Sequence, residues 1–195
     1  MIKYKLYAKT CYLNIHELRR LYSGPKRRNG LFTKNFNDEI GEELLSQRAQ
    51  QDTVLLGETT YKFFADIWPE EPNTDPFAKH INQVKKIVFS KTLTFAPWGQ
   101  YKAADIINGN TLEEINKLKK EPGKDIVIIG SANLIQNLAA LDLIDEYQIM
   151  LEPIILGGGK PLFLNYKDPV DLQLSKSRAF TNGAVALYYQ PIKNT

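Results

Sequence analysis

Residues 125–138 read DIVIIGSANLIQNL, in which an apolar run stops at Gly130 and Ser131. Leu134 and Leu138 then follow at helical spacing, so the segment is predicted to be a buried strand that turns directly into a helix. Such a turn places backbone N–H groups and the positive end of the helix dipole at the carboxyl edge of a sheet, where a phosphate can bind. Because one glycine is a weak motif, a plain reversal of the chain explains this segment equally well.

Two predicted strands upstream end in the same kind of residue. The run DTVLL at 52–56 stops at Gly57, with Thr59 and Thr60 following after Glu58, and KIVF at 86–89 stops at a serine. The carboxyl ends of parallel strands lie along one edge, which is where ligands of open α/β sheets bind. Three such strand ends favour a nucleotide site. The residues at the two upstream ends are Gly57, Thr59, Thr60, Ser90 and Thr92.

Composition limits the class of protein. The 195 residues are 43% hydrophobic and 24% charged, which is enough for one globular domain over residues 1–195. One cysteine and two histidines make a metal site unexpected. Without a membrane-length apolar run or a signal-peptide pattern at the N-terminus, we expect a cytoplasmic protein with no membrane partner.

Basic residues cluster at Arg19-Arg20 and at 26–28, within a net charge of +3. Binding to nucleic acid is one interpretation of such clusters, and it predicts a steep dependence on salt. No aromatic residues interleave with these arginines, as they do on a base-stacking surface. We therefore expect solvated loops and no nucleic-acid partner.

The other local patterns complete the architecture. Helices are predicted at 38–45 and 75–83, and a capping box at Thr111–Glu114 starts another. A strand at 147–151 precedes two strands joined by Asn182-Gly183, a hairpin signal. The order predicts an α/β fold with a parallel core and antiparallel strands at its C-terminal edge.

Five blocks in order resemble the dihydrofolate reductase-like superfamily, and specifically the C-terminal reductase domain of the bifunctional riboflavin-biosynthesis deaminase/reductase. The match covers about residues 38–191 and implies a three-layer fold. Its sheet is mixed and mainly parallel, with an antiparallel C-terminal hairpin and helices on both faces. The blocks are LLGETTY at 55–61, VFSKTL at 88–93, DIVIIGS at 125–131, LIDEY at 143–147 and PIILGGGKPLF at 153–163.

The resemblance implies an NADPH-dependent oxidoreductase that acts as a homodimer. Its substrate would be a small heterocyclic or sugar-like molecule, as for 5-amino-6-(5-phosphoribosylamino)uracil reductase of riboflavin biosynthesis. Two alternatives are a catalytically degenerate nucleotide-binding homodimer and a dihydrofolate reductase-like pteridine reductase. The resemblance assigns coenzyme contacts to Gly57, Thr59, Thr60, Ser90, Thr92, Gly130, Ser131, Ala132 and Leu134, and substrate contacts to Asn14, Tyr61, Gly157 and Gly158.

Aromatic residues also follow the first glycine turn at helical spacing. Tyr61, Phe64 and Trp68 could stack on a ligand or pack in the core, and packing is the expected role of Phe64.

Two positions depart from the family pattern. Glu58 stands where relatives carry an arginine that pairs with phosphate, so NADH, a flavin or no cofactor are alternatives to NADPH. Our hypothesis is that Glu58 turns away or meets a ribose hydroxyl. Asn14 stands where relatives carry an aspartate, and Asp38 or Glu39 is the candidate to replace that carboxylate in orienting substrate or relaying a proton. Alternatively, both acids only stabilise the first turn of a helix.

Overall fold

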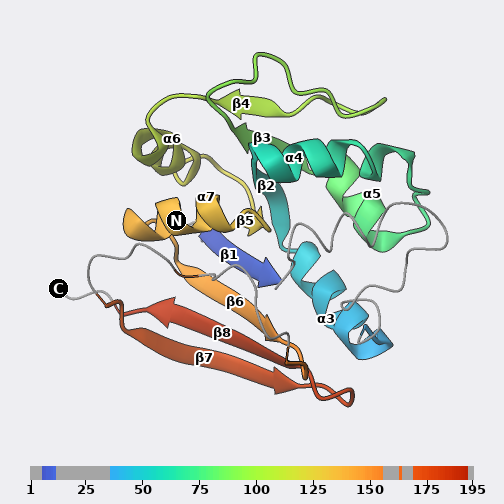
Figure 1. Cartoon of the computed structure of the whole chain (residues 1–195), viewed down its shortest axis with the longest axis vertical. Helices are drawn as coiled ribbons and strands as arrows, with labels where there is room; N and C mark the ends of the chain where they lie inside the picture. Colours follow the sequence, from blue (N-terminus) through green and yellow to red (C-terminus); the bar gives the residue numbers. More distant parts are fainter. Residues whose placement is uncertain (1–5, 12–35, 156–162, 164–168, 193–195) are drawn as a thin grey trace.

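The computed structural model describes residues 6–11, 36–155, 163 and 169–192. Eight strands form one sheet in the order β4-β3-β2-β5-β1-β6-β8-β7, shown in Figure 1. The strands are β1 (Leu6–Cys11), β2 (Gln51–Gly57), β3 (Lys85–Phe89), β4 (Asp105–Ile107), β5 (Asp125–Ile129), β6 (Glu146–Leu151), β7 (Leu172–Ala179) and β8 (Val185–Pro191). The helices are α3 (Asp38–Arg48), α4 (Glu58–Ala65), α5 (Pro76–Gln83), α6 (Thr111–Leu118) and α7 (Ala132–Ala140), with a 3-10 turn η1 (Trp68–Glu70).

The direction of the strands confirms the expected mixed sheet. The six strands from β4 to β6 are all parallel, whereas β8 pairs antiparallel with β6 and β7 pairs antiparallel with β8. Gly183 closes the β7–β8 hairpin at a φ of 88°, a conformation that favours glycine. The hairpin that Asn182-Gly183 predicted is therefore present, and it lies at one end of the sheet, as expected.

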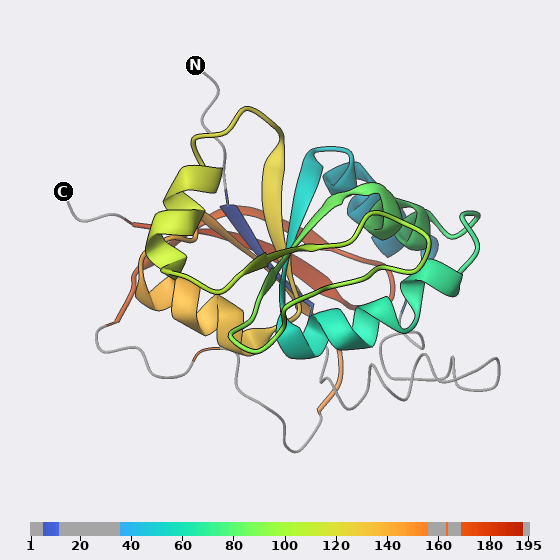
Figure 2. The same cartoon turned by 90° about the horizontal axis from the view of Figure 1, so that it is seen from above.

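Helices cover both faces of the sheet, which gives the predicted three layers (Figure 2). Alternating residues of the central strands face opposite ways: Leu55 packs with α6 and α7, while Val54 and Leu56 pack with α4 and α5. A third cluster joins Ile40 and Leu44 of α3 to β6 and β8. These three clusters hold the helices against the sheet, including those that begin at the carboxyl ends of the parallel strands.

Side-chain caps begin three of the helices. Asn37 caps α3 and Asp75 caps α5, each accepting hydrogen bonds from backbone N–H groups of the first turn. The cap of α6 is Asn110 rather than the predicted Thr111, because the Asn110 side chain both accepts from backbone N–H groups of the first turn and donates to Glu113. In place of the predicted box at Thr111–Glu114, α6 thus has an Asn110 cap whose side chain also contacts Glu113.

Polar contacts anchor the N-terminus of α3 to the β7–β8 turn. The Glu39 carboxylate accepts from the backbone N–H and the hydroxyl of Thr181, at 2.9 and 2.7 Å. Those hydrogen bonds lower the pKa of Glu39. Since this turn adjoins the pairing of Leu151 with Val185 at the end of β6, α3 begins at the carboxyl edge of the parallel strands.

No helix among the described residues is long and apolar enough to cross a membrane.

Candidate functional site

The carboxyl ends of β2 and β5 pack against each other. A Cβ built on Gly57 would lie 2.1 Å from the Ser131 hydroxyl and 3.3 Å from the Ser131 Cβ, so the two turns are in close contact. Figure 2 shows the N-terminal ends of α4 and α7 meeting at this edge of the sheet. The two strand-to-helix turns predicted from the sequence therefore form one continuous surface.

The backbone of the second turn is constrained. Gly130 has a φ of 64°, and Ser131 follows with a φ of 50°. Ser131 is the N-cap of α7 but makes no capping hydrogen bond with its side chain. Positive φ at a residue other than glycine costs on the order of 1–3 kcal/mol and concentrates at functional sites. The strained residue thus lies where the sequence predicted a ligand.

Neither helix at this surface has a side-chain cap. Gly57 precedes α4 and Ser131 precedes α7, and neither satisfies the first N–H groups of its helix. By contrast, α3, α5 and α6 are all capped by side chains. The two helices that follow central strands directly therefore keep the dipole and N–H groups that attract an anion.

Thr60 contributes a buried hydroxyl between the two turns. Its side chain is 2% exposed and packs beside Gly130. Within the described parts of the chain, its Oγ1 has no hydrogen-bond partner. A buried hydroxyl without a partner costs on the order of 1–3 kcal/mol, so Thr60 marks a place where a further polar group is needed.

Glu58 connects the end of β2 to the end of β3. Its Oε2 accepts hydrogen bonds from Ser90 Oγ at 2.5 Å and Thr92 Oγ1 at 2.7 Å. Its Oε1 pairs with Lys62 Nζ at 2.6 Å, one turn along α4. The hydrogen bonds from Lys62, Ser90 and Thr92 lower the pKa of Glu58 to about 2. The structure thus brings Ser90 and Thr92 together as predicted, with a carboxylate between them.

The remaining predicted coenzyme residues differ in exposure. Thr59 is exposed and Ala132 half-buried, both in the first turns of their helices. The Leu134 side chain is buried in the core beneath α7.

The aromatic residues after Gly57 lie in the core. Tyr61 is 4% exposed and its hydroxyl donates to the Pro97 carbonyl oxygen at 2.8 Å. Phe64 and Trp68 are buried in the same cluster, which confirms the packing role expected of Phe64. The predicted substrate residue Tyr61 is therefore occupied by contacts within the protein.

The predicted proton-relay residue Asp38 is exposed at the first position of α3. Through the Glu39–Thr181 contacts, it shares the carboxyl edge with Gly57 and Gly130, on the β6 side. The predicted substrate residues Asn14, Gly157 and Gly158 lie outside the described residues, as do the basic clusters at 19–20 and 26–28.

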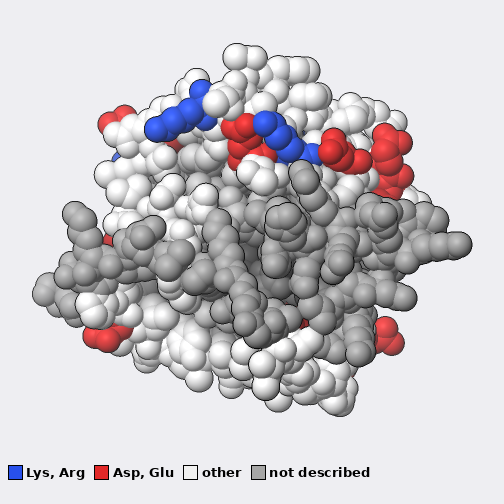
Figure 3. Space-filling view, in the orientation of Figure 1, with Lys and Arg blue, Asp and Glu red and all other residues white. Residues whose placement is uncertain are grey.

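Lys62 is the site residue that our sequence reasoning missed. Glu58 and Lys62 are four residues apart, the spacing of ion pairs on a helix, and that spacing was the available signal. Figure 3 shows acidic and basic side chains next to one another over the described surface of α4.

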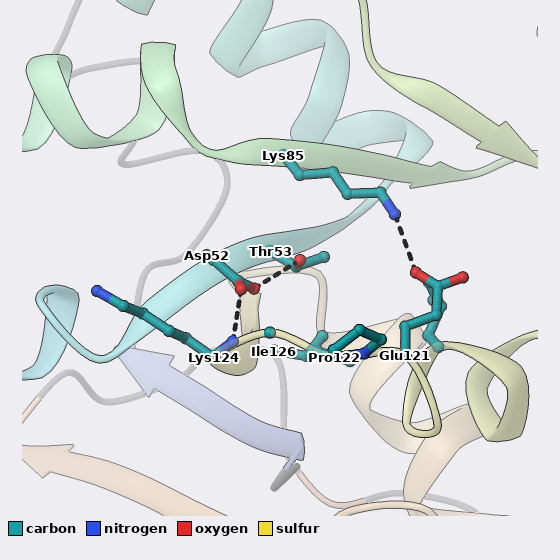
Figure 4. Close-up of a pocket in the computed structure, with 9 residues that line it drawn as sticks. Asp52, Thr53, Lys85, Glu121, Pro122, Lys124 and Ile126 are labelled. Atoms are coloured by element: carbon teal, nitrogen blue, oxygen red, sulfur yellow. Dashed lines mark hydrogen bonds and ion pairs between the residues drawn. The ribbon is translucent and has the colours of Figure 1, made fainter.

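A pocket of about 200 Å³ lies at the opposite, amino edge of the sheet. Figure 4 shows that its polar groups pair with one another: Thr53 and the backbone N–H of Lys124 donate to Asp52, and Lys85 pairs with Glu121 at 3.5 Å. These contacts hold the loop before β5 against β2. The pocket is thus built by structural contacts and is remote from the paired glycine turns.

Comparison with known proteins identifies the family. The family model described as the RibD C-terminal domain matches residues 37–186. The chain is 39% identical over 143 residues to the uncharacterized protein YyaP of Bacillus subtilis (strain 168), covering 72% of this chain and 74% of that protein.

Solved structures share the fold. One is a putative riboflavin biosynthesis protein from Shewanella sp. PV-4, with a TM-score of 0.68 and 20% identity, covering 98% of this chain and 100% of that one. Dihydrofolate reductase from Enterococcus faecalis, complexed with NADP(H), has a TM-score of 0.58 and 12% identity, covering 98% and 100%. The fold is therefore the dihydrofolate reductase-like one expected from the sequence, and the chain belongs to the RibD C-terminal domain family.

Proposed function

We propose that this protein is a reductase of the riboflavin-biosynthesis type that binds a nicotinamide dinucleotide at the carboxyl edge of β2, β3 and β5. The observation that carries the proposal is the pair of interlocked turns at Gly57 and Ser131, from which two uncapped helices begin. Two such N-termini side by side suit the two phosphates of a dinucleotide, which backbone N–H groups can bind without a lysine.

The residues present fit such a coenzyme. No described residue bonds to Thr60 Oγ1, and a phosphate oxygen, or a water held by it, would supply that partner. Thr59 and Ala132 flank the same helix starts. When bound, the coenzyme supplies the hydride, and the protein contributes binding and orientation.

Asp38 is the candidate that delivers a proton to the reduced bond. It is an exposed carboxyl group at the edge where the coenzyme would lie, on the side of β6. Its role would be that of the general acid in the reduction. The substrate class remains a small heterocyclic or sugar-like molecule, and the homodimer remains a prediction from the family.

The test is a titration of the protein with NADPH and NADH, followed by tryptophan fluorescence or calorimetry. Ser131→Asp adds a negative charge at the proposed phosphate site, whereas Ser131→Asn has the same size and no charge. Aspartate and asparagine tolerate positive φ better than most other residues, so both variants should fold. We expect Ser131→Asp to weaken binding at least tenfold relative to Ser131→Asn, because like charges repel at short range.

Saturable binding by neither coenzyme would overturn the proposal. Equal coenzyme affinity in the two Ser131 variants would show that the phosphates do not bind at this turn. Tight binding without reduction of any pyrimidine, pteridine or sugar-like substrate would favour the degenerate nucleotide-binding alternative.

A further inference from the structure

The group that separates NADPH from NADH is a phosphate on the adenosine ribose. A protein that selects NADPH offers that phosphate hydrogen-bond donors and positive charge, whereas a carboxylate suits the free ribose hydroxyls of NADH. The resemblance to the reductase family implies that Ser90 and Thr92 lie beneath the adenosine ribose and its phosphate. The hydrogen bonds that they already make therefore decide which coenzyme fits.

Ser90 has no donor left for a phosphate. A serine hydroxyl has one hydrogen and two lone pairs. The hydrogen goes to Glu58, and the oxygen accepts from the backbone N–H groups of Thr92 and Leu93 at 3.1 and 3.0 Å. Ser90 is also 7% exposed, which leaves little room for a second arrangement.

Thr92 is committed in the same way. Its hydroxyl donates to Glu58 Oε2 at 2.7 Å, although its side chain is exposed. Both hydroxyl hydrogens at the end of β3 therefore point at one carboxylate oxygen. A phosphate here would meet acceptors and a negative charge.

Glu58 itself can accept one more hydrogen bond. An ionised carboxylate has about four lone-pair positions. Ser90 and Thr92 take two on Oε2, and Lys62 takes one on Oε1. The remaining position on Oε1 suits a donor such as a ribose hydroxyl. The low pKa of Glu58 keeps the carboxylate ionised at neutral pH.

Lys62 does not reverse this preference. Its ammonium group pairs with the carboxylate at 2.6 Å, and its side chain is 58% exposed, so its charge is partly neutralised by Glu58 and screened by water. We infer that Glu58, held by Ser90 and Thr92, is the specificity-determining residue that makes this protein select NADH over NADPH. This inference rests on the proposed function, because it presumes that a dinucleotide binds at this edge.

The test measures dissociation constants of the full chain for NADH and NADPH, by calorimetry or fluorescence, without any substrate. We expect NADH to bind about tenfold more tightly or better, a difference of about 1.4 kcal/mol. Glu58→Gln removes the charge at constant size and should bring the ratio close to one, and Glu58→Ala should do so as well by freeing both hydroxyls. Glu121→Gln is the matched control, because it removes an exposed carboxylate at the opposite edge and should leave the ratio unchanged.

The possible results separate the two proposals. Equal or tighter binding of NADPH by the unmodified protein overturns the inference and leaves the proposed function intact. An unchanged preference for NADH in both Glu58 variants also overturns it, because selectivity would then lie elsewhere. If neither coenzyme binds, the proposed function fails, and the inference fails with it.

Discussion

Ser131 Oγ occupies the space in which a Cβ of residue 57 would have to lie, so a larger residue at position 57 would force the Ser131 hydroxyl into another rotamer. Ser131 holds this position with a left-handed backbone. The missing side chain of Gly57 and the strained backbone of Ser131 therefore belong to the same contact.

Gly57→Ala should destabilise the protein by about 1–3 kcal/mol, because the added methyl group overpacks the contact with Ser131. Ser131→Gly removes the obstructing side chain and suits the positive φ, so the double variant Gly57→Ala/Ser131→Gly should recover most of that loss. Urea unfolding of all four proteins gives the coupling between the positions. The same cost of Gly57→Ala in both backgrounds would contradict the contact.

A second prediction concerns Glu43, a buried carboxylate between α3 and the β7–β8 hairpin. Lys176 and Arg178 pair with it at 2.8 and 2.6 Å, and the Tyr188 hydroxyl donates to it at 2.5 Å. Burial alone would raise the pKa of Glu43, but the hydrogen bonds from Lys176, Tyr188 and Arg178 lower it to about 2.

The pKa of Glu43 makes the stability depend on pH. Its folded pKa lies below the ordinary value of 4.5, so its contribution is fully present above about pH 4.5 and is lost as the pH falls toward 2. Glu43→Gln should therefore cost about 3 kcal/mol at pH 7 and progressively less below pH 4.5. Denaturant unfolding at several pH values checks this, with Glu121→Gln as an exposed control. A cost independent of pH would show that the charge does not matter.

Lys86 provides a third test, because its buried ammonium group closes the end of α5. The side chain is 3% exposed and its Nζ lies 5.0 Å from the centre of the Trp98 ring. Lys86→Met keeps the aliphatic length but leaves buried carbonyl groups without a donor, which should cost about 2–4 kcal/mol in thermal or urea unfolding. The control Lys85→Met changes an exposed neighbour and should cost less than about 0.5 kcal/mol. The carbonyl groups belong to Ile81, Asn82 and Val84, at 3.1, 3.0 and 2.9 Å.

Tyr61→Phe separates a packing role from a substrate role. Because the Tyr61 hydroxyl donates to Pro97, we expect a loss of stability of about 1 kcal/mol and no change in coenzyme affinity. Tyr101→Phe is the control, since the Tyr101 hydroxyl makes only a long, exposed bond of 3.4 Å to Asn73. If Tyr61→Phe left stability intact but raised the KM for a substrate, the prediction from the family would hold instead.

The elements that could be predicted from the sequence are those set by local patterns. The strand before Gly130 and the hairpin at Gly183 depend on neighbouring residues, and both were predicted correctly. The three-residue strand β4 is too short and too exposed to give a periodic signal. The cap of α6 was displaced by one residue because Asn110 and Thr111 are both good capping residues.

The side-chain network of the site was beyond local reasoning. Glu58 meets Ser90 and Thr92 across 32 and 34 positions, and Glu43 meets Tyr188 across 145. The pairing of β2 with β3 brings Glu58 to Ser90 and Thr92, and the packing of α3 on β8 brings Glu43 to Tyr188. The sequence therefore predicted which strand ends matter, and the structure supplied the hydrogen bonds between them.

Ligand binding at the hydroxyl of Thr60 would affect how fast the protein is degraded in the cell. Among the described residues this hydroxyl has no hydrogen-bond partner and α4 and α7 have no side-chain cap, so a ligand that bonds to these groups would bind only the folded state and add to its stability. The fraction of unfolded chains exposed to proteases then falls as the ligand accumulates. The abundance of the protein would thus follow the supply of that ligand.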